Sequence, residues 1–299
     1  MAVIAAYRPG PALRENIAGI ARQVSRVVVV DDGSPAGSEE LFAELRAEGV
    51  TVVTQPSNKG IAAALNAGIA HAREESEPDY FLTFDQDSLP GPGYVAAAVD
   101  TCRRAQLAGL RVGFISASSY SGHPIPVRGS VAGFVRAFDP MQSGFLIPRA
   151  TLDEIGLFDE GLFIDGVDSE YTMRTRSAGL EVLVGDGCEI QHDLGQREPA
   201  VLLGRPVRIM GRDISYNYHS PGRVYYICRN GTALSLRYVR KDPQWVFRRL
   251  IEEAKAHTLR LAFSRGRGKL VRAAVSGFRD AVCGGTGPIP PALGEKLNR

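Results

Sequence analysis

Residues 27–34 read Val-Val-Val-Val-Asp-Asp-Gly-Ser, and they give the clearest indication of the fold class. Four consecutive β-branched residues are typical of a strand that is buried on both faces of a parallel sheet. The acidic turn that follows ends the strand. Residues 80–87, Tyr-Phe-Leu-Thr-Phe-Asp-Gln-Asp, repeat the arrangement of an apolar run followed by carboxylates. Two strands of this kind predict a sheet with an acidic carboxyl edge.

Strand and helix patterns alternate around these two stretches. Strand patterns lie at 3–6, 27–30, 50–54 and 80–84, and helical spacing of apolar residues occurs at 13–21, 39–48 and 60–74. This order predicts an α/β fold with a mostly parallel central sheet that is flanked by helices on both faces.

The alternation weakens after residue 87. We expect helices at 94–108, 150–155 and 168–178, strands at 112–116, 145–147 and 181–184, and a loop or hairpin over a cleft at 118–136. Residues 193–222 have no clear period, amphipathic helical patterns begin at 223, and residues 284–291 have the composition of a disordered tail. The expected domains are therefore a catalytic domain at 1–222, with halves at about 1–117 and 118–222, and a helical region with a tail at 223–299.

The composition is that of a globular protein, because 44% of the 299 residues are hydrophobic and 23% are charged. The four cysteines are far apart and form no Cys-x-x-Cys pair, which argues against a zinc site or a disulfide framework. The chain starts in a strand pattern without a leader, and no apolar run approaches 18 residues. These features predict a cytoplasmic protein with reduced thiols and no transmembrane helix.

Acidic residues follow two strands of the predicted sheet, at 31–32 and at 85 and 87. Ligands of open α/β sheets bind at the carboxyl ends of the strands. The spacing of Asp85 and Asp87 presents two carboxylates to one hard cation, and Mg²⁺ or Mn²⁺ held in this way keeps positions free for phosphates. The alternative interpretation is that these acids are turn residues or caps.

The order of several short motifs resembles the inverting family 2 glycosyltransferases, which have a GT-A fold. The motifs are Arg8-Pro9, Asp31-Asp32-Gly33-Ser34, Asn58-Lys59-Gly60 leading to Asn66, Asp85-Gln86-Asp87, and the block from Phe158 to Arg174. Residues 192–195, His-Asp-Leu-Gly, and 225–230, Tyr-Tyr-x-x-Arg-Asn, are similar to the bacterial rhamnosyltransferase branch. The resemblance covers roughly residues 3–236.

The resemblance implies a nucleotide-sugar donor site and a metal site. The expected nucleotide and donor contacts are Ala6, Tyr7, Arg8, Asp31, Asp32, Asn58, Lys59, Asn66, Asp85 and Gln86. The expected ligands of Mg²⁺ or Mn²⁺ are Asp85, Asp87 and His192, although a histidine at this place is equally well a core or loop residue. The donor nucleotide is expected to be dTDP or UDP, since a carboxylate can accept the imide N–H of either base.

The resemblance also assigns a general base. Aligned on Arg174, the family's catalytic aspartate falls on Asp168, while Val167 replaces the glutamate that precedes it in the family. Asp165 is the rival candidate. Further contacts to the acceptor or diphosphate are expected from Ser143, Gly144, Asp165, Arg174 and Arg229. A turn at 142–144 and an ordinary surface role for Arg229 are the alternatives.

The segment from Arg237 to Arg272 is basic, with eleven Lys or Arg residues against three acids. Together with Trp245, Phe247, Phe263 and Phe278 as apolar anchors, it is expected to lie on an anionic membrane surface. The alternatives are a helical pair packed on the body with a solvated basic face, or a dimer contact. No nucleic acid is expected as a partner.

The function expected from the resemblance is inverting transfer of a sugar from a nucleotide-sugar to a glycan or lipid-linked glycan. L-Rhamnose from dTDP-rhamnose is the expected donor sugar, and other sugars are alternatives. The enzyme would work in the cytoplasm, either free or on the cytoplasmic face of the membrane. A catalytically silent scaffold is the rival function, but Asp85, Asp87 and Asp168 are all present. A nucleotidyltransferase would want a Gly-rich basic loop, and Arg8-Pro9-Gly10 is a poor version of one.

Overall fold

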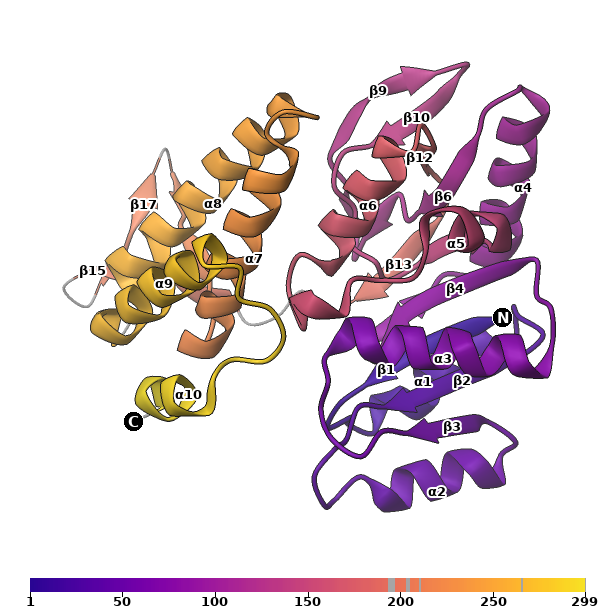
Figure 1. Cartoon of the computed structure of the whole chain (residues 1–299), viewed down its shortest axis with the longest axis horizontal. Helices are drawn as coiled ribbons and strands as arrows, with labels where there is room; N and C mark the ends of the chain where they lie inside the picture. The colour runs from indigo at the N-terminus through magenta and orange to yellow at the C-terminus, as the bar shows by residue number, and fades with distance from the viewer. Residues whose placement is uncertain (193–196, 203–204, 210, 265, 299) are drawn as a thin grey trace. The chain divides into compact units, whose positions relative to one another are not determined.

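The computed structural model describes residues 1–192, 197–202, 205–209, 211–264 and 266–298 (Figure 1). The chain divides into two compact units, Met1–Asp193 and Leu194–Arg299. Residues 197–222, which we expected in the catalytic domain, therefore group with the C-terminal helices. The strands described within 197–217 form short antiparallel pairs of two or three residues each, too short to show a sequence period.

Among the described residues, nine strands form the central sheet in the order β3-β2-β1-β4-β11-β6-β12-β10-β9. Their bounds are β1 Ala2–Ala6, β2 Val27–Asp31, β3 Thr51–Thr54, β4 Tyr80–Asp85, β6 Val112–Ser116, β9 Val127–Val131, β10 Phe134–Ala137, β11 Phe145–Pro148 and β12 Glu181–Val184. The strands β1 to β4 run parallel, as the alternating pattern predicted. Parallel register places Ala6 opposite Asp31 and Ala5 opposite Asp85, so the acidic strand ends meet at one edge.

The second half of the sheet is mixed rather than mostly parallel. Strand β11 runs antiparallel to both β4 and β6, and the hairpin β9–β10 adds antiparallel strands at the edge. Only β12 and β6 are parallel among these pairs. In this half the sheet is therefore not mostly parallel. A strand inserted between two others can run in either direction, and its local sequence does not encode that direction.

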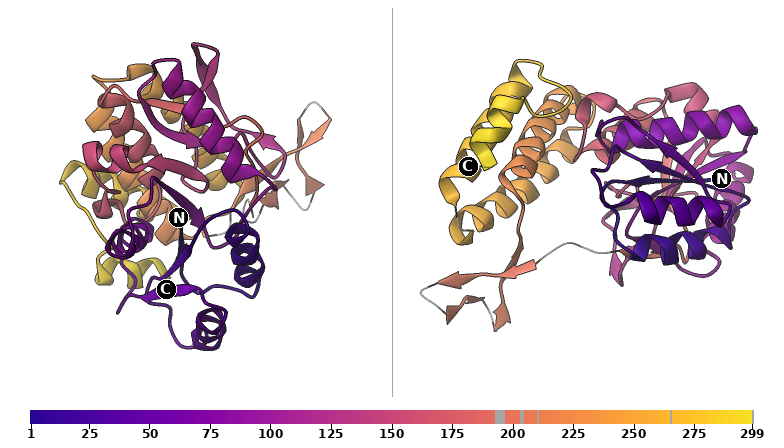
Figure 2. Two further views of the ribbon diagram at one scale, coloured as in Figure 1. Left: turned by 90° about the vertical axis from the view of Figure 1, so that its right-hand side faces the viewer. Right: turned by 90° about the horizontal axis from the view of Figure 1, so that it is seen from below.

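Helices cover both faces of this sheet (Figure 2). Those of the first unit are α1 Ala12–Ala21, α2 Glu39–Ala47, α3 Ile61–Glu75, α4 Tyr94–Leu107, α5 Arg149–Ile155 and α6 Val167–Ser177, with a 3₁₀ turn, η1, at Glu160–Leu162. Helix α3 packs against β1 and β2 with Gly68 touching the side chains of Val3 and Val30. The small residue lets the helix approach the sheet closely.

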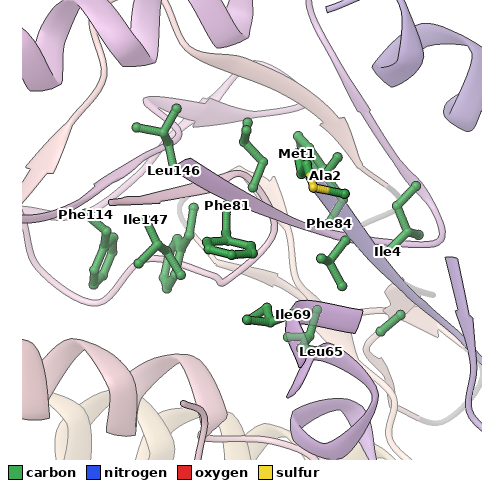
Figure 3. Close-up of a cluster of buried hydrophobic side chains, with 14 of the residues drawn as sticks. Met1, Ala2, Ile4, Leu65, Ile69, Phe81, Phe84, Phe114, Leu146 and Ile147 are labelled. Atoms are coloured by element: carbon green, nitrogen blue, oxygen red, sulfur yellow. The ribbon is translucent and has the colours of Figure 1, made fainter. Parts of the chain in front are cut away.

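The core of the first unit lies between the sheet and its helices. Figure 3 shows Phe81 of β4 facing Ile69 of α3, with Ile147 of β11 beside it. Phe84 points to the other face of the sheet, where its ring meets that of Tyr94 in α4 with centroids 6.2 Å apart. Phe114 and Phe145 stack with ring centroids 4.1 Å apart. Burial of these side chains is the main stabilising contribution to the sheet, at about 1.5–3 kcal/mol for each large apolar residue.

A small second sheet, β5-β13-β7-β8, stands beside the carboxyl edge. Its strands are β5 Ser88–Pro90, β7 Ser119–Tyr120, β8 His123–Pro124 and β13 Glu189–His192. Antiparallel pairing of β5 with β13 sets His192 opposite Ser88. The loop expected at 118–136 is thus built of short strands, and the sheet brings a histidine more than 100 residues away in the chain next to the Asp85-Gln86-Asp87 turn.

The second unit consists of helices and hairpins. Its helices are α7 Pro221–Tyr238, α8 Pro243–Phe263, α9 Arg267–Val282 and α10 Pro291–Asn298, and its strands are β14 Arg197–Pro199, β15 Val201–Leu202, β16 Arg205–Pro206, β17 Arg208–Ile209, β18 Arg212–Asp213 and β19 Ser215–Asn217. The tail expected to be disordered is packed instead, because Arg229 donates to the carbonyl of Gly287 (2.6 Å) and the N–H of Ile289 donates to Tyr226 (2.5 Å). Within the described residues, no helix combines the length and apolar character needed to cross a bilayer.

Candidate active site

Two buried aspartates, Asp31 at the end of β2 and Asp32 directly after it, organise the loops around this strand. Asp31 Oδ1 accepts the N–H of Ser34 (2.9 Å) and closes the turn. Asp32 accepts the N–H groups of Lys59 and Gly60, each at 2.8 Å. Burial raises the pKa of the Asp32 carboxyl above its ordinary value, and the two backbone hydrogen bonds oppose this rise. Asp32 therefore holds the 58–60 loop beside the end of β2, and the nucleobase contact expected of both aspartates stays a prediction.

The ends of β1 and β4 are tied together. The N–H of Tyr7 donates to Gln86 Oε1 (2.8 Å), and the amide of Asn16 donates to the carbonyl of Gln86 (2.9 Å). Arg8 has a φ of 50° and donates its N–H to Ser34 Oγ (2.8 Å). The exposed Tyr7 and Arg8 thus stand beside the turn after β2, where the expected nucleotide site lies.

Asp85, Asp87 and His192 form a three-residue group suited to a metal ion, the one such group among the described residues. One ligand atom from each lies within 4.8 Å of the other two. His192 Nδ1 is 3.4 Å from Asp87 Oδ1. Carboxylates are preferred by Mg²⁺ and Mn²⁺, and an imidazole is an acceptable further ligand for a transition metal. The donor set fits the divalent cation expected from the sequence.

Buried side chains hold this group in place. Ser88 Oγ lies 2.8 Å from His192 Nδ1 and 2.7 Å from Ser143 Oγ. The N–H of Asp85 donates to Ser143 Oγ (3.2 Å), and Gln142 donates its amide to the Asp85 carboxylate. A hydrogen bond to one ring nitrogen fixes the orientation of a metal-binding histidine. The hydroxyls of Ser88 and Ser143 therefore form a chain of hydrogen bonds from His192 to the backbone of Asp85.

Gly144 permits this arrangement by a close backbone approach. Its φ is 92°, and a Cβ atom here would collide with the Tyr94 hydroxyl and with Ile190. Tyr94 donates its hydroxyl to the Gly144 carbonyl (2.6 Å). Ser143 and Gly144 were expected near the donor sugar. In the structure Ser143 Oγ accepts the N–H of Asp85, and Gly144 is the next residue in the chain.

Tyr120 packs beside the metal group. Its hydroxyl donates to the carbonyl of Ser143 (2.8 Å), and its ring meets the His192 ring edge-on with centroids 6.0 Å apart. Burial raises the pKa of the Tyr120 hydroxyl well above its ordinary value, and the negative charges of Asp85 and Asp168 raise it further. Asp85 and Asp168 thus act on one phenol, although 83 residues separate them in the chain.

Asp168 lies in the first turn of α6 and is half-buried. Its Oδ1 accepts the N–H of Ser169 (2.8 Å), and Ser169 Oγ donates to Asp139 (3.0 Å). Asp165 lies just before the helix with a φ of 61°, a conformation in which few residues other than glycine are found. Glu170 is buried and its carboxylate accepts from Arg174 (2.9 Å), so it faces away from solvent.

Three residues expected at the site form hydrogen bonds with the protein's own loops. Arg174 donates to Glu170 and to the carbonyls of Ile155 and Leu157. These hydrogen bonds connect α6 with the loop that precedes it. Arg229 lies in the helical unit, is 1% exposed and donates to Gly287. These hydrogen bonds hold both guanidinium groups within the protein, and their expected contacts with acceptor or diphosphate stay predictions.

Asn66 is the third of these residues. Its buried amide donates to the carbonyl of Phe158 and to Glu160 Oε1, both at 2.9 Å, and accepts the N–H of Phe158 (3.0 Å). The side chain therefore forms three hydrogen bonds within the protein, and its expected contact with a nucleotide stays a prediction. It anchors the loop that leads towards Asp165 and Asp168.

The 58–60 loop reaches the same segment from the nucleotide side. Asn58 Oδ1 accepts the N–H of Gly60 (3.1 Å), and the N–H of Ile61 donates to the carbonyl of Phe163 (2.9 Å). Lys59 is exposed, so its ammonium group is accessible to an anion. The loop bound by Asp32 therefore rests on the chain two residues before Asp165.

Gly60→Ala should lower the stability of the first unit. Gly60 has a φ of 93°, and a Cβ atom would collide with the carbonyl of Phe163. Strain of this kind costs about 1–3 kcal/mol. Urea unfolding followed by circular dichroism measures the loss. Gly49→Ala is the matched control, because Gly49 also has a positive φ, 84°, but nothing lies within 4 Å of the new atom. An equal loss in both variants would contradict the proposed contact.

Sequence reasoning missed Ser88 and Tyr120. Ser88 directly follows the Asp85-Gln86-Asp87 turn, and this adjacency was an available signal. Tyr120 lies in a polar stretch without periodicity, and nothing in the sequence connects it with residues 85 or 168. The residues 193–195 of the His-Asp-Leu-Gly motif lie outside the described residues.

Residues 1–145 match the family model "Glycosyl transferase family 2". The chain contains a family 2 glycosyltransferase domain. The glycosyltransferase is also similar to dTDP-rhamnosyl transferase RfbF of Shigella flexneri, with 28% identity over 256 residues that cover 78% of each chain. This similarity extends beyond the family model into the C-terminal part of the chain.

Solved structures show that the glycosyltransferase has the GT-A fold. The mannosyltransferase PcManGT from Pyrobaculum calidifontis, solved with GDP-Man and Mn²⁺, aligns with a TM-score of 0.54 and 18% identity over 99% of this chain and 78% of its own. TarS of S. aureus aligns with a TM-score of 0.52 and 15% identity over 98% of this chain and 49% of its own. The glycosyltransferase thus spans about half the length of TarS.

Proposed function

We propose that this protein transfers a sugar from a nucleotide-sugar donor to a hydroxyl group, with a divalent cation bound by Asp85, Asp87 and His192. The observation that carries the proposal is the three-ligand group beside the acidic strand ends of a family 2 domain. Mn²⁺ is present in the solved PcManGT structure, which supports the choice of metal. A bound cation would neutralise charge on the departing diphosphate.

The proposed donor is dTDP-L-rhamnose. The similarity to the dTDP-rhamnosyl transferase RfbF, which covers 78% of both chains, supports this sugar over the alternatives. In the proposed site the diphosphate lies at Asp85 and Asp87, and the nucleoside extends towards Tyr7, Asp31 and Lys59. The backbone N–H groups of Arg8 and Lys59 bind Ser34 and Asp32 directly after β2, which supports this placement.

The proposed reaction inverts the anomeric carbon in a single displacement. Asp168 accepts the proton of the acceptor hydroxyl while its oxygen forms the new glycosidic bond and the bond to the diphosphate breaks. A general base must lie within hydrogen-bond reach of that hydroxyl. The half-buried Asp168, whose charge acts on the same tyrosine as Asp85, is suited to this role.

The proposed acceptor is a glycan or lipid-linked glycan, and the proposed location is the cytoplasm, with peripheral binding to the cytoplasmic face of the membrane. A scaffold without activity is the competing function. It is disfavoured because a protein without catalysis has no need of the buried Ser88 and Ser143 support behind three potential metal ligands.

A donor screen tests the proposed function. Purified protein is incubated with Mn²⁺ or Mg²⁺ and a panel of nucleotide sugars, and release of the nucleotide is measured. We expect the fastest release from dTDP-rhamnose and none after chelation by EDTA. Release from another donor alone would replace rhamnose, and no release or binding of any donor would favour the scaffold.

Ser88→Ala should weaken metal binding without unfolding the protein. The variant loses the hydroxyl 2.8 Å from His192 Nδ1, and removing such a partner of a metal-binding histidine typically lowers affinity about 10–100-fold. Titration of Mn²⁺ in the presence of dTDP, followed by electron paramagnetic resonance, measures the change.

Ser119→Ala is the matched control. Ser119 is buried on the neighbouring strand β7, and its hydroxyl makes no hydrogen bond within the described part of the chain. The control should bind Mn²⁺ as the wild type does. Equal affinity in all three proteins would remove Ser88 from any role in orienting His192.

A further inference from the structure

Helix α9 has one face committed to the helical unit. Leu270, Ala273, Gly277 and Ala281 are buried, and α9 packs along α7. A Cβ atom on Gly277 would collide with the carbonyl of Tyr225, so the two helices approach closely at this glycine. The close packing fixes which side of α9 points away from α7.

The side of α9 about 100° round the helix from this buried face carries an apolar stripe formed by Val271, Val275, Phe278 and Val282. These residues are 46%, 63%, 58% and 61% exposed, respectively. Their spacing of four, three and four residues places them along one line of a helix. An apolar stripe of this length on the surface marks a contact site, because scattered exposure does not produce such regular spacing.

Basic residues border the α9 stripe. Arg272 and Arg279 each follow a stripe residue by one position, which turns them about 100° around the helix to the same flank. Asp280 is the one carboxylate of α9, all of whose residues the structure describes, and it accepts the hydroxyl of Tyr225 (2.7 Å). Its charge is therefore directed towards α7, and the outer surface of the helix is apolar and cationic.

This combination distinguishes between two kinds of partner. An antiparallel two-fold contact between α9 helices of two copies would bury the apolar stripe but would gather Arg272 and Arg279 of both copies on the same side of the contact, and like charges repel. An anionic lipid surface accepts both features, since acyl chains cover the stripe and phosphates bind the arginines. The charge pattern favours the membrane.

We propose that α9 docks this protein on an anionic bilayer through the α9 stripe, with Arg272 and Arg279 bound to lipid phosphates. The proposal deepens the peripheral location proposed above and rests on it, but it is independent of the sugar and of catalysis. It also corrects the anchors expected from the sequence. Trp245 is fully buried and Phe263 is partly buried, so of those four aromatic residues only Phe247 and Phe278 are exposed.

Co-sedimentation of the full-length protein with vesicles tests this surface. Vesicles of phosphatidylcholine alone are compared with vesicles that also contain phosphatidylglycerol, at low and high salt. We expect binding to the anionic vesicles alone, and weaker binding at high salt because ions screen the attraction. Arg272→Gln with Arg279→Gln should lower the partition coefficient roughly thirty-fold, since each basic residue near an anionic surface contributes about 1 kcal/mol. Val275→Ser with Phe278→Ser should also abolish most binding.

Matched controls lie on the catalytic unit. Leu107→Ser removes an apolar side chain that is 89% exposed at the end of α4, and Arg22→Gln with Arg103→Gln removes two exposed charges. Both should bind vesicles as the wild type does. Nucleotide release from a soluble donor is measured for every variant, and it should be unchanged, which separates a failed docking surface from a failed enzyme.

Three results would overturn the proposal. Wild-type protein that stays in the supernatant with anionic vesicles at low salt excludes the membrane. Wild-type binding by both α9 variants shows that another surface carries it. Dimerisation in analytical ultracentrifugation that Val275→Ser with Phe278→Ser abolishes would identify a second copy of the chain as the occupant of the α9 stripe.

Discussion

Asp168→Asn should lower kcat for sugar transfer by about 10²–10⁴-fold, the typical contribution of a general base, while donor affinity stays close to that of the wild type. Asparagine keeps the size of the side chain, and its amide oxygen can still accept the N–H of Ser169. It cannot take a proton from the acceptor hydroxyl. Single-turnover transfer rates and calorimetric titration with dTDP and Mn²⁺ measure the two quantities.

Two neighbouring carboxylates serve as controls for this base. Asp165→Asn should cost much less, although Asp165 is the rival candidate and lies three residues away. Glu170→Gln should affect stability rather than transfer, because Glu170 is buried and bound to Arg174. An inactive Asp165→Asn together with an active Asp168→Asn would exchange their roles. Full activity in all three variants would contradict a carboxylate base in this segment.

Asp87→Asn should largely abolish the metal-dependent part of donor binding and leave the fold intact. The Asp87 carboxylate is exposed at the turn after β4, 3.4 Å from His192 Nδ1, so the substitution removes a charge without opening the core. Hard cations prefer charged oxygen ligands, and a neutral amide is a weaker one. Calorimetry with dTDP, with and without Mn²⁺, measures the effect.

Asp186→Asn is the matched control for Asp87. Asp186 is also exposed and pairs with Arg104 (2.6 Å) on the surface of the same unit. This variant should keep the Mn²⁺-dependent gain in dTDP affinity. If Asp87→Asn keeps that gain as well, Asp87 does not bind the metal and the three-residue group loses its proposed role.

The nucleotide half of the fold could be predicted from the sequence because its signals are local. A β-branched run such as 27–30 has to be buried on both faces, and a parallel neighbour then requires a crossover helix. The strands and helices up to residue 85 follow that rule, and the acidic strand ends meet as expected. Local signals do not specify direction, which is why the antiparallel β11 was not expected.

The supporting residues of the site could not be predicted in the same way. Asn66 and Arg174 match family motifs, but only the structure shows that their polar atoms are engaged by Phe158, Ile155 and other backbone groups. Tyr120 contacts Ser143 and His192, which come from distant segments, and no sequence spacing encodes these contacts. The residue types indicated the chemistry of the site. Which of these residues face a ligand and which hold the surrounding loops depends on tertiary packing.

The position of β11 determines when the central sheet can be completed during synthesis of the chain. The family match ends at residue 145, the first residue of β11, yet β11 fills the gap between β4 and β6. A nascent chain that stops there leaves β4 as an open edge, and exposed edges pair readily with other chains. A fragment cut at the family boundary should therefore aggregate, and a self-contained catalytic fragment must extend past β12.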